Sequence, residues 1–152
     1  MAPLILLRSD HRDGASAVRT LRGLAGQFLA SLRLSQAQLS VVVTTDRRIR
    51  KVNREWRGKD QATDVLSFPA ADVPGPKEWG RPLGDVVISL DTARRRAKED
   101  GRPLKDELAR YLAHGLLHLL GHDHQTEAQA TKMARAEAKL LGSAGMVLGP
   151  SE

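Results

Sequence analysis

The stretch LSVVVTTDRRIRKVNREWRGKDQATDVLSFP, residues 39–69, contains three segments with different patterns. Its first seven residues, 39–45, are rich in β-branched side chains, which is typical of a strand. Asp46 follows as an expected helix N-cap for residues 47–56, and residues 64–69 form a short strand that proline stops. The stretch therefore predicts a strand, a helix and a second strand in succession.

The segments on either side continue this alternation of strands and helices. Residues 2–7 and 84–90 are expected to be strands, and helices are expected over residues 16–33, from a cap at Asp91 to about residue 100, over 103–120 and over 126–141. This order predicts an α+β (mixed α/β) fold with a small mixed sheet of about four strands covered by helices. We expect residues 1–152 to form a single domain, because no interdomain linker interrupts the chain.

Composition limits the possible partners and compartments. The chain carries 24 Lys and Arg against 18 Asp and Glu, a formal net charge of +6 that favours a polyanionic partner such as nucleic acid. It has no cysteine, so a bound metal must be held by histidine or carboxylate ligands. The apolar run Leu4–Leu7 is too short for a signal peptide or a membrane span. We therefore expect a cytoplasmic protein with no membrane partner.

The stretch HGLLHLLGHDH, residues 114–124, has the spacing of a metal site. His114 and His118 are four residues apart in a predicted helix, so both imidazoles project from one face. Gly121 is expected to end the helix in a left-handed conformation and to turn the chain so that His124 returns to the same point. Three neutral imidazoles leave one position of a tetrahedral zinc ion for water, which is the arrangement of a catalytic site.

The residues around these histidines receive different interpretations. The opposite helix face is apolar and is expected to be buried: Leu108, Leu112, Leu116 and Leu119. Glu107 and Tyr111 are then expected to face a cleft with the histidines. His11 is interpreted as a surface residue, and His122 as exposed or as a support behind a ligand. Asp123 either orients a ligand imidazole or caps the turn.

Two other classes of zinc protein are alternatives. The metzincin peptidases share the histidine and glycine spacing, H-E-x-x-H-x-x-G-x-x-H, but their general base is replaced here by Gly115. Peptide hydrolysis would need a base from elsewhere in the chain, so this alternative is the weaker one. The other alternative is a ribosome-associated module with a structural zinc, in which a carboxylate such as Asp85 would close the fourth position.

The same stretch resembles the H-G-x-L-H-L-x-G-x-D-H signature of the YbeY family of bacterial endoribonucleases. Residues 53–69 are similar to the family segment N-x-x-x-R…T-D-V-L-S-F-P, and residues 83–93 to its L-G-D-I-x-I-S block. The resemblance implies a zinc-dependent endoribonuclease that acts on single-stranded RNA. It further implies a role in ribosomal RNA maturation, notably at the 3′ end of the small-subunit RNA, and in ribosome quality control, with the ribosome or small-subunit proteins as partners.

The resemblance also assigns residues. It implies that His114, His118 and His124 hold the zinc ion and that Arg57 is a functional arginine, whose planar guanidinium can hold two phosphate oxygens. Imidazole ligands also suit other divalent transition metals. The nucleophile stays open between a water activated by zinc and the 2′-hydroxyl of the RNA. Asp64 and Asp85 are each interpreted either as groups that assist catalysis or as turn caps, and the sequence leaves the oligomeric state open.

Six cations near Arg57 fit a track for an RNA backbone, with an ordinary exposed helix face as the alternative: Arg47, Arg48, Arg50, Lys51, Arg54 and Lys59. Arg94, Arg95 and Arg96 would extend this track. Aromatic residues make up only 3% of the chain, so a broad stacking platform is not expected. Trp79 is the best candidate for stacking on a base, whereas Trp56 is expected to pack into the core.

Overall fold

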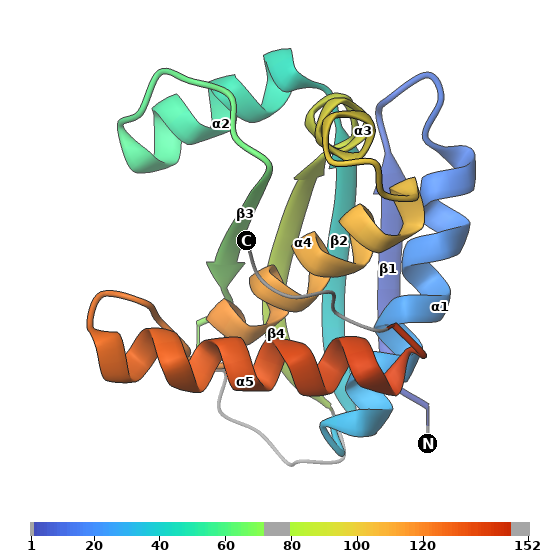
Figure 1. Ribbon diagram of the computed structural model, residues 1–152, viewed down its shortest axis with the longest axis vertical. Helices are drawn as coiled ribbons and strands as arrows, with labels where there is room; N and C mark the ends of the chain where they lie inside the picture. Colours follow the sequence, from blue (N-terminus) through green and yellow to red (C-terminus); the bar gives the residue numbers. More distant parts are fainter. Residues whose placement is uncertain (1, 72–79, 147–152) are drawn as a thin grey trace.

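The computed structural model describes residues 2–71 and 80–146 (Figure 1). Its strands are β1 (Leu4–Ser9), β2 (Ala37–Thr44), β3 (Val65–Pro69) and β4 (Arg81–Ser89), and its helices are α1 (Ala15–Ser31), α2 (Asp46–Arg57), α3 (Leu90–Glu99), α4 (Leu104–Leu119) and α5 (Glu127–Ser143). Every strand and helix expected from the sequence is present, with ends shifted by a few residues. Of the helices in the described ranges, none combines the length and the apolar character that crossing a lipid bilayer requires.

The four strands form one mixed sheet in the order β1-β2-β4-β3. The first three strands of this order are parallel, and β3 pairs antiparallel with β4 at one edge. This arrangement confirms the predicted α+β fold with a small mixed sheet. Because β3 is an edge strand, the main-chain groups on its outer side are available to side chains from other elements.

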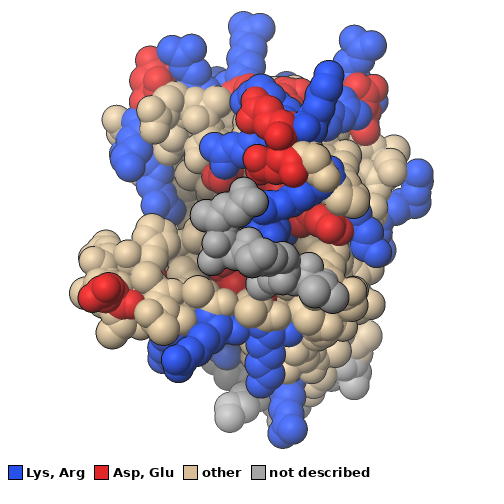
Figure 2. All heavy atoms as spheres, in the orientation of Figure 1, with Lys and Arg blue, Asp and Glu red and all other residues tan. Residues whose placement is uncertain are grey.

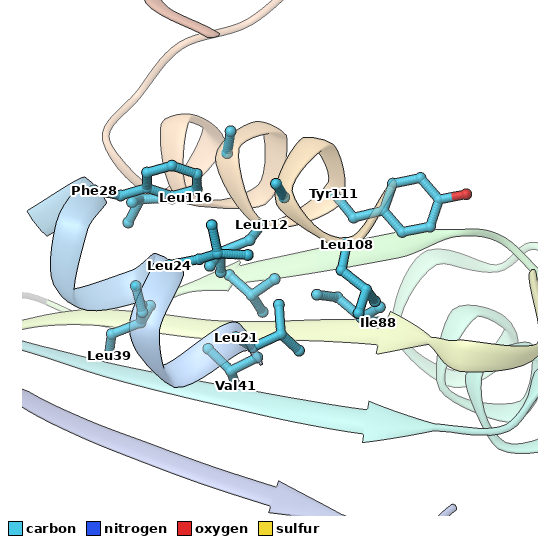
Figure 3. Close-up of a cluster of buried hydrophobic side chains, with 14 of the residues drawn as sticks. Leu21, Leu24, Phe28, Leu39, Val41, Ile88, Leu108, Tyr111, Leu112 and Leu116 are labelled. Carbon is cyan, nitrogen blue, oxygen red and sulfur yellow. The ribbon is translucent and has the colours of Figure 1, made fainter. Parts of the chain in front are cut away.

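Helices cover one face of this sheet in two layers (Figure 1). α1 and α4 pack directly on the strands, where Leu21 and Leu24 of α1 and Leu112 of α4 meet Val41 and Ile88 (Figure 3). α5 lies across α4 and α1 as the outer layer, and α2 and α3 lie beyond the ends of the parallel strands. The four leucines predicted for the apolar face of α4 are all buried: Leu108, Leu112, Leu116 and Leu119.

The N-caps of two helices differ from the prediction. The cap of α2 is Thr45 rather than Asp46, and the cap of α3 is Ser89 rather than Asp91. Both aspartates instead lie in the first turn, where their carboxylates connect the two helices. Asp46 accepts hydrogen bonds from the hydroxyls of Ser89 and Thr92 at 2.6 Å each. Thr45, one residue before Asp46, and Ser89, two residues before Asp91, have the extended backbone of a cap, so their hydroxyls replace the aspartates there.

His11 is buried, which makes the prediction of a surface histidine wrong. The residue is only 9% exposed, because the connection between β1 and α1 folds against the start of α3. The backbone N–H of Asp13 donates to His11 Nδ1 at 3.0 Å, so the ring proton is on Nε2 and is donated to Asp91 at 2.8 Å. Both ring nitrogens are satisfied by protein groups, and we assign His11 a structural role.

Gly115 allows α4 to lie unusually close to the sheet. A Cβ atom at this position would lie 2.8 Å from Val86 Cγ1 and 3.3 Å from Val65 Cγ2. The helix backbone therefore rests directly on side chains of β4 and β3. This contact sets the depth at which the neighbouring His114 is held.

We expect Gly115→Ala to lower the free energy of unfolding by about 1–2 kcal/mol. Overpacking a core costs about 1–3 kcal/mol, which exceeds the gain of up to ~1 kcal/mol from replacing a helical glycine by alanine. Urea denaturation followed by circular dichroism would measure the change. The matched control is Gly23→Ala in α1, where a Cβ atom meets nothing within 4 Å, so this variant is expected to be slightly more stable than the wild type. Equal effects of both substitutions would contradict the importance of the close contact.

Candidate metal centre

Three histidines converge at the C-terminal end of α4. One ring nitrogen from each of His114, His118 and His124 lies within 4.8 Å of the others. The two Nε2 atoms of His114 and His118 are 3.1 Å apart, and the ring centroid of His124 is 5.7 Å and 5.2 Å from theirs. Among the residues that the structure describes, no other group of three or more His, Asp or Glu side chains meets this criterion.

Gly121 ends α4 and reverses the chain, as the sequence predicts. It has a φ of +93°, in the left-handed region that favours glycine. Its N–H donates to the carbonyl of His118 at 3.0 Å, and the N–H of His122 donates to the carbonyl of Leu117 at 3.0 Å. This pair of hydrogen bonds is the Schellman motif. It satisfies two of the last carbonyl groups of α4 and ends the helix.

The residues after this turn bring His124 back toward α4 and start α5. Asp123 accepts a hydrogen bond from the backbone N–H of His124 at 2.8 Å, which identifies the carboxylate as a cap of the turn. Thr126 and Gln129 then form a reciprocal capping box at the start of α5. The connection between the two helices is therefore short and held at both ends.

The hydrogen bonds of the two helical histidines determine which nitrogens face each other. His118 Nδ1 lies 2.9 Å from the carbonyl oxygen of His122, and His114 Nδ1 lies 2.7 Å from a carboxylate oxygen of Glu137. Carbonyl and carboxylate oxygens accept, so both Nδ1 atoms carry protons and both neutral rings present Nε2 lone pairs. Lone pairs 3.1 Å apart repel each other unless a metal ion, or an extra proton on His114, lies between them. Ligand nitrogens of a tetrahedral zinc ion would be about 3.3 Å apart, so the residues fit this metal.

The same environment changes the pKa values of these two histidines in opposite directions. The hydrogen bond to Glu137 raises the pKa of His114, although burial opposes this change. Burial is the main cause that lowers the pKa of His118, and the neighbouring His114 contributes to the decrease. His118 is therefore held in the neutral form that metal binding requires, whereas His114 releases its extra proton when it binds a cation.

Glu137 is a residue of the site that the sequence analysis missed. It lies in α5, where Met133, Leu140 and Leu141 form the buried face. Glu137 is four residues after Met133 and four before Leu141, so a carboxylate stands on an apolar stripe at helical spacing. A carboxylate at a position expected to be apolar is the feature of the sequence that could have identified Glu137. Its partner could not be named from the sequence, because α5 meets α4 only in the folded chain.

His122 contributes to the site through its main chain. Its carbonyl oxygen holds His118, and its own ring nitrogens are not in the histidine group. This arrangement is one of the two possibilities predicted for His122. The ring of His118 is thus oriented by the turn that Gly121 creates.

Arg57 is anchored at the outer edge of β3. Its Nη2 atom donates to the carbonyl oxygen of Ser67 at 2.7 Å, and its Cζ atom lies 5.5 Å from the ring centroid of Phe68. β3 lies over α4, where Val65 faces Gly115. One donor of the guanidinium is used by the strand, and the remaining N–H groups are available to other acceptors.

The six cations of the predicted RNA track are all exposed, but half of them face carboxylates. The ion pairs are Arg48 with Asp10 at 3.2 Å, Arg50 with Asp60 at 2.9 Å and Arg54 with Asp60 at 3.9 Å. Arg47, Lys51 and Lys59 form no ion pair within the described ranges. Arg94, Arg95 and Arg96, the predicted extension, are paired with Asp13, Asp46 and Asp64 at 3.1, 3.2 and 2.8 Å. The accessible positive charge is therefore smaller than the sequence indicates.

Glu107 and Tyr111 do not face the cleft that was predicted for them. They are only 4% and 5% exposed, because α3 covers the N-terminal half of α4. The carboxylate of Glu107 lies 3.5 Å from Arg102 Nη1. Asp64 accepts a hydrogen bond from the N–H of Val65 at 2.8 Å and pairs with Arg96, so it caps the start of β3.

Asp85 and Trp56 also differ from expectation. Asp85 is exposed and alternates with Val86 along β4; since Val86 faces α4, Asp85 lies on the opposite face of the sheet from the histidines. It therefore cannot close a fourth metal position. Trp56 is 72% exposed rather than packed into the core, because the last turn of α2 contacts only the edge of the sheet. Trp79 lies outside the described residues.

Comparisons with known proteins show to which family the chain is similar. The family model described as "Endoribonuclease YbeY" matches residues 10–145. A protein named endoribonuclease YbeY from Anaeromyxobacter dehalogenans is 58% identical over 144 residues, which cover 95% of this chain and 73% of the relative. A protein of the same name from Thermus thermophilus is 44% identical and covers 87% of this chain and 94% of that protein.

Two further comparisons concern length and fold. A YbeY endoribonuclease from Myxococcus xanthus is 55% identical, and the chain spans 49% of its length. The solution structure of a protein from Thermotoga maritima superposes with a TM-score of 0.59 at 21% identity, covering 98% of this chain and 99% of the other. This last similarity supports the fold alone.

We expect Glu137→Gln to weaken zinc binding by about 10- to 100-fold, the usual effect of losing the carboxylate behind a metal-ligating histidine. The amide can present its NH₂ group to His114 Nδ1, which would turn the ring proton toward the metal. Competition with a chromophoric zinc chelator would measure the dissociation constant without any activity assay. Glu127→Gln, in the first turn of the same helix, is the matched control and should bind zinc as the wild type does. Equal affinity of all three proteins would contradict this role of Glu137.

Proposed function

The chain belongs to the YbeY endoribonuclease family, and from this we propose that it is a metal-dependent endoribonuclease that cleaves single-stranded RNA. The observation that carries the proposal is the group of three imidazoles whose accessible nitrogens face one another while Glu137 and the carbonyl of His122 hold two of the rings from behind. Such a group has little use in packing, since its facing nitrogens need a shared proton or a metal ion between them.

Zinc is the proposed metal, held by His114, His118 and His124. A zinc ion would supply Lewis acidity at the phosphate oxygens, on which negative charge develops during cleavage. The chain's own contribution is to keep His118 neutral by burial and to orient His114 through Glu137. Both effects prepare the rings to bind a cation before it arrives.

Arg57 is the proposed group that binds the phosphate. Its hydrogen bond to Ser67 and its contact with Phe68 fix the guanidinium at the edge of β3, so little side-chain freedom is lost when RNA binds. A planar guanidinium can present two N–H groups to two oxygens of one phosphate, which an ammonium cannot do. We therefore infer that Arg57 stabilises the charge of the transition state.

The proposed substrate is ribosomal RNA, at the 3′ end of the small-subunit RNA, with the ribosome or small-subunit proteins as partners in the cytoplasm. The resemblance in three sequence motifs and the net charge of +6 support this proposal. Figure 2 shows Lys and Arg side chains gathered over the part of this face that α2 and α3 occupy, with Asp and Glu between them. Arg47, Lys51 and Lys59 are the cations of the track that we propose for contacts with the RNA backbone.

The two alternative functions have less support. A peptidase of the metzincin type needs a glutamate at position 115, where a Cβ atom would already lie 2.8 Å from Val86 Cγ1. A closed structural zinc site needs a fourth ligand, and Asp85 lies on the opposite face of the sheet. The group formed by the described residues contains three histidines and no carboxylate, which favours the open site of a catalytic metal.

The nuclease proposal is tested with end-labelled precursor small-subunit ribosomal RNA. Zinc-loaded wild type is expected to cleave it, whereas His118→Ala, purified in parallel, is expected not to, because two imidazoles bind zinc much more weakly than three. A contaminating ribonuclease would act equally in both preparations. Equal cleavage by the two proteins, or cleavage by neither, would count against the proposal.

We expect Arg57→Ala to reduce the cleavage rate by on the order of 100-fold, the typical loss when one donor to transition-state charge is removed. Its zinc content should stay the same, since Arg57 does not contact the histidines. Arg57→Lys should recover only part of the rate because an ammonium lacks the planar fork. Arg22→Ala removes an exposed arginine from α1 and serves as the control. Loss of zinc or of the fold in Arg57→Ala would contradict the proposed role.

A further inference from the structure

Trp56 is an exposed aromatic side chain beside the proposed phosphate-binding arginine. At 72% exposure it is the most exposed large hydrophobic residue in the part of the chain that the structure describes. The other two, Leu4 and Leu6, belong to β1 at the far edge of the sheet. An exposed indole beside an arginine presents a flat apolar face on which a planar ligand can stack.

The ring of Trp56 is held in place although it is exposed. Its centroid lies 6.3 Å from that of Phe68 in an edge-to-face contact with an interplanar angle of 65°. Arg57 packs on the same Phe68 ring from 5.5 Å and is bonded to Ser67. The three side chains thus form one unit on the edge of β3, which we call the Trp56 platform: Trp56, Arg57 and Phe68. Its indole surface is available without rearrangement of the chain.

The charges around the platform favour an anionic partner. Arg54, Arg57 and Lys59 lie within three residues of Trp56 and are all exposed. The neighbouring carboxylates are Glu55 and Asp60, and Asp60 is shared by Arg50 at 2.9 Å and Arg54 at 3.9 Å, so the cations still outnumber the carboxylates. The end of α2 therefore combines a flat aromatic surface with excess positive charge, which is the chemistry of single-stranded nucleic acid binding.

We propose that a base of single-stranded RNA stacks on Trp56 while Arg57 holds an adjacent phosphate. This inference rests on the proposed function and extends it by naming a base-binding residue. Stacking on an indole needs no particular base, because every base has a π face. A double helix cannot present an unstacked base, so the platform selects single strands over duplexes.

The experiment compares two ligands that lack a free 2′-hydroxyl and whose integrity is checked by gel electrophoresis. One is a fluorescein-labelled 2′-O-methyl oligoribonucleotide, and the other has the same backbone with abasic sugars throughout. All proteins in this experiment carry Trp79→Phe. Fluorescence anisotropy would give both dissociation constants for this parent protein and for its Trp56→Ala and Trp56→Phe variants. In that background Trp56 is the only tryptophan, since the sequence contains two, so quenching of its fluorescence reports stacking directly. Leu6→Ala removes another exposed apolar side chain, from β1, and is the control.

We expect Trp56→Ala to weaken binding of the base-bearing ligand by about 5- to 150-fold and to leave binding of the abasic ligand unchanged. Trp56→Phe should retain most of the affinity, and the base-bearing ligand alone should quench Trp56 fluorescence. Equal weakening of both ligands would show that Trp56 only supports the structure, and would overturn the proposal. Unchanged affinity for both ligands would also overturn it, as expected if Trp56 instead serves a protein partner.

These outcomes are independent of the test of the nuclease. Binding of the base-bearing ligand can depend on Trp56 even if His118→Ala and the wild type do not differ in cleavage, in which case only the nuclease proposal fails. Cleavage by the wild type together with indifference to Trp56 would reject the stacking proposal alone.

Discussion

α4 lies on the sheet with no side chain between its backbone and the methyl groups of Val86 at Gly115, and the histidine site depends on this close contact. Because the helix is so near β4 and β3, the residues on either side of Gly115 are held at a fixed depth and angle. His114 and His118 lie on the face of α4 that α3 leaves uncovered. The same contact leaves no room for the glutamate that metzincin peptidases place at this position. One steric constraint therefore both positions the candidate metal ligands and disfavours one of the chemistries proposed for them.

The path of the chain after α4 completes the site. The left-handed conformation of Gly121 allows the Schellman hydrogen bonds, and the turn that follows supplies the carbonyl that orients His118 and the third imidazole. The capping box of Thr126 starts α5 at once, so this helix runs back across α4 and brings Glu137 to His114. Local hydrogen bonds thus position a carboxylate 23 residues away from the ring it holds.

On the opposite side of the site, the edge strand β3 organises the groups proposed to bind RNA. An edge strand has outward main-chain groups, and the carbonyl of Ser67 uses this position to fix Arg57. Phe68 on the same strand supports both Arg57 and Trp56. Several other arginines of α2 and α3 are paired with aspartates of neighbouring loops or of the first turn of α2, so their charge is largely used within the protein. The few described cations without such partners therefore matter more for RNA binding than the net charge of the chain does.

The order of strands and helices, the buried face of α4 and the convergence of three histidines all follow from local patterns, which the sequence displays directly. β-branched runs, helical spacing and a glycine at a left-handed turn are properties of neighbouring residues. The burial of His11, the exposure of Trp56, the position of Asp85 and the role of Glu137 depend instead on which elements meet in space. The connection after β1 buries His11 against Asp91, and α2 ends past the edge of the sheet, which leaves Trp56 in solvent. Such contacts join residues that are far apart in the chain, so a periodic pattern of neighbouring residues cannot predict them.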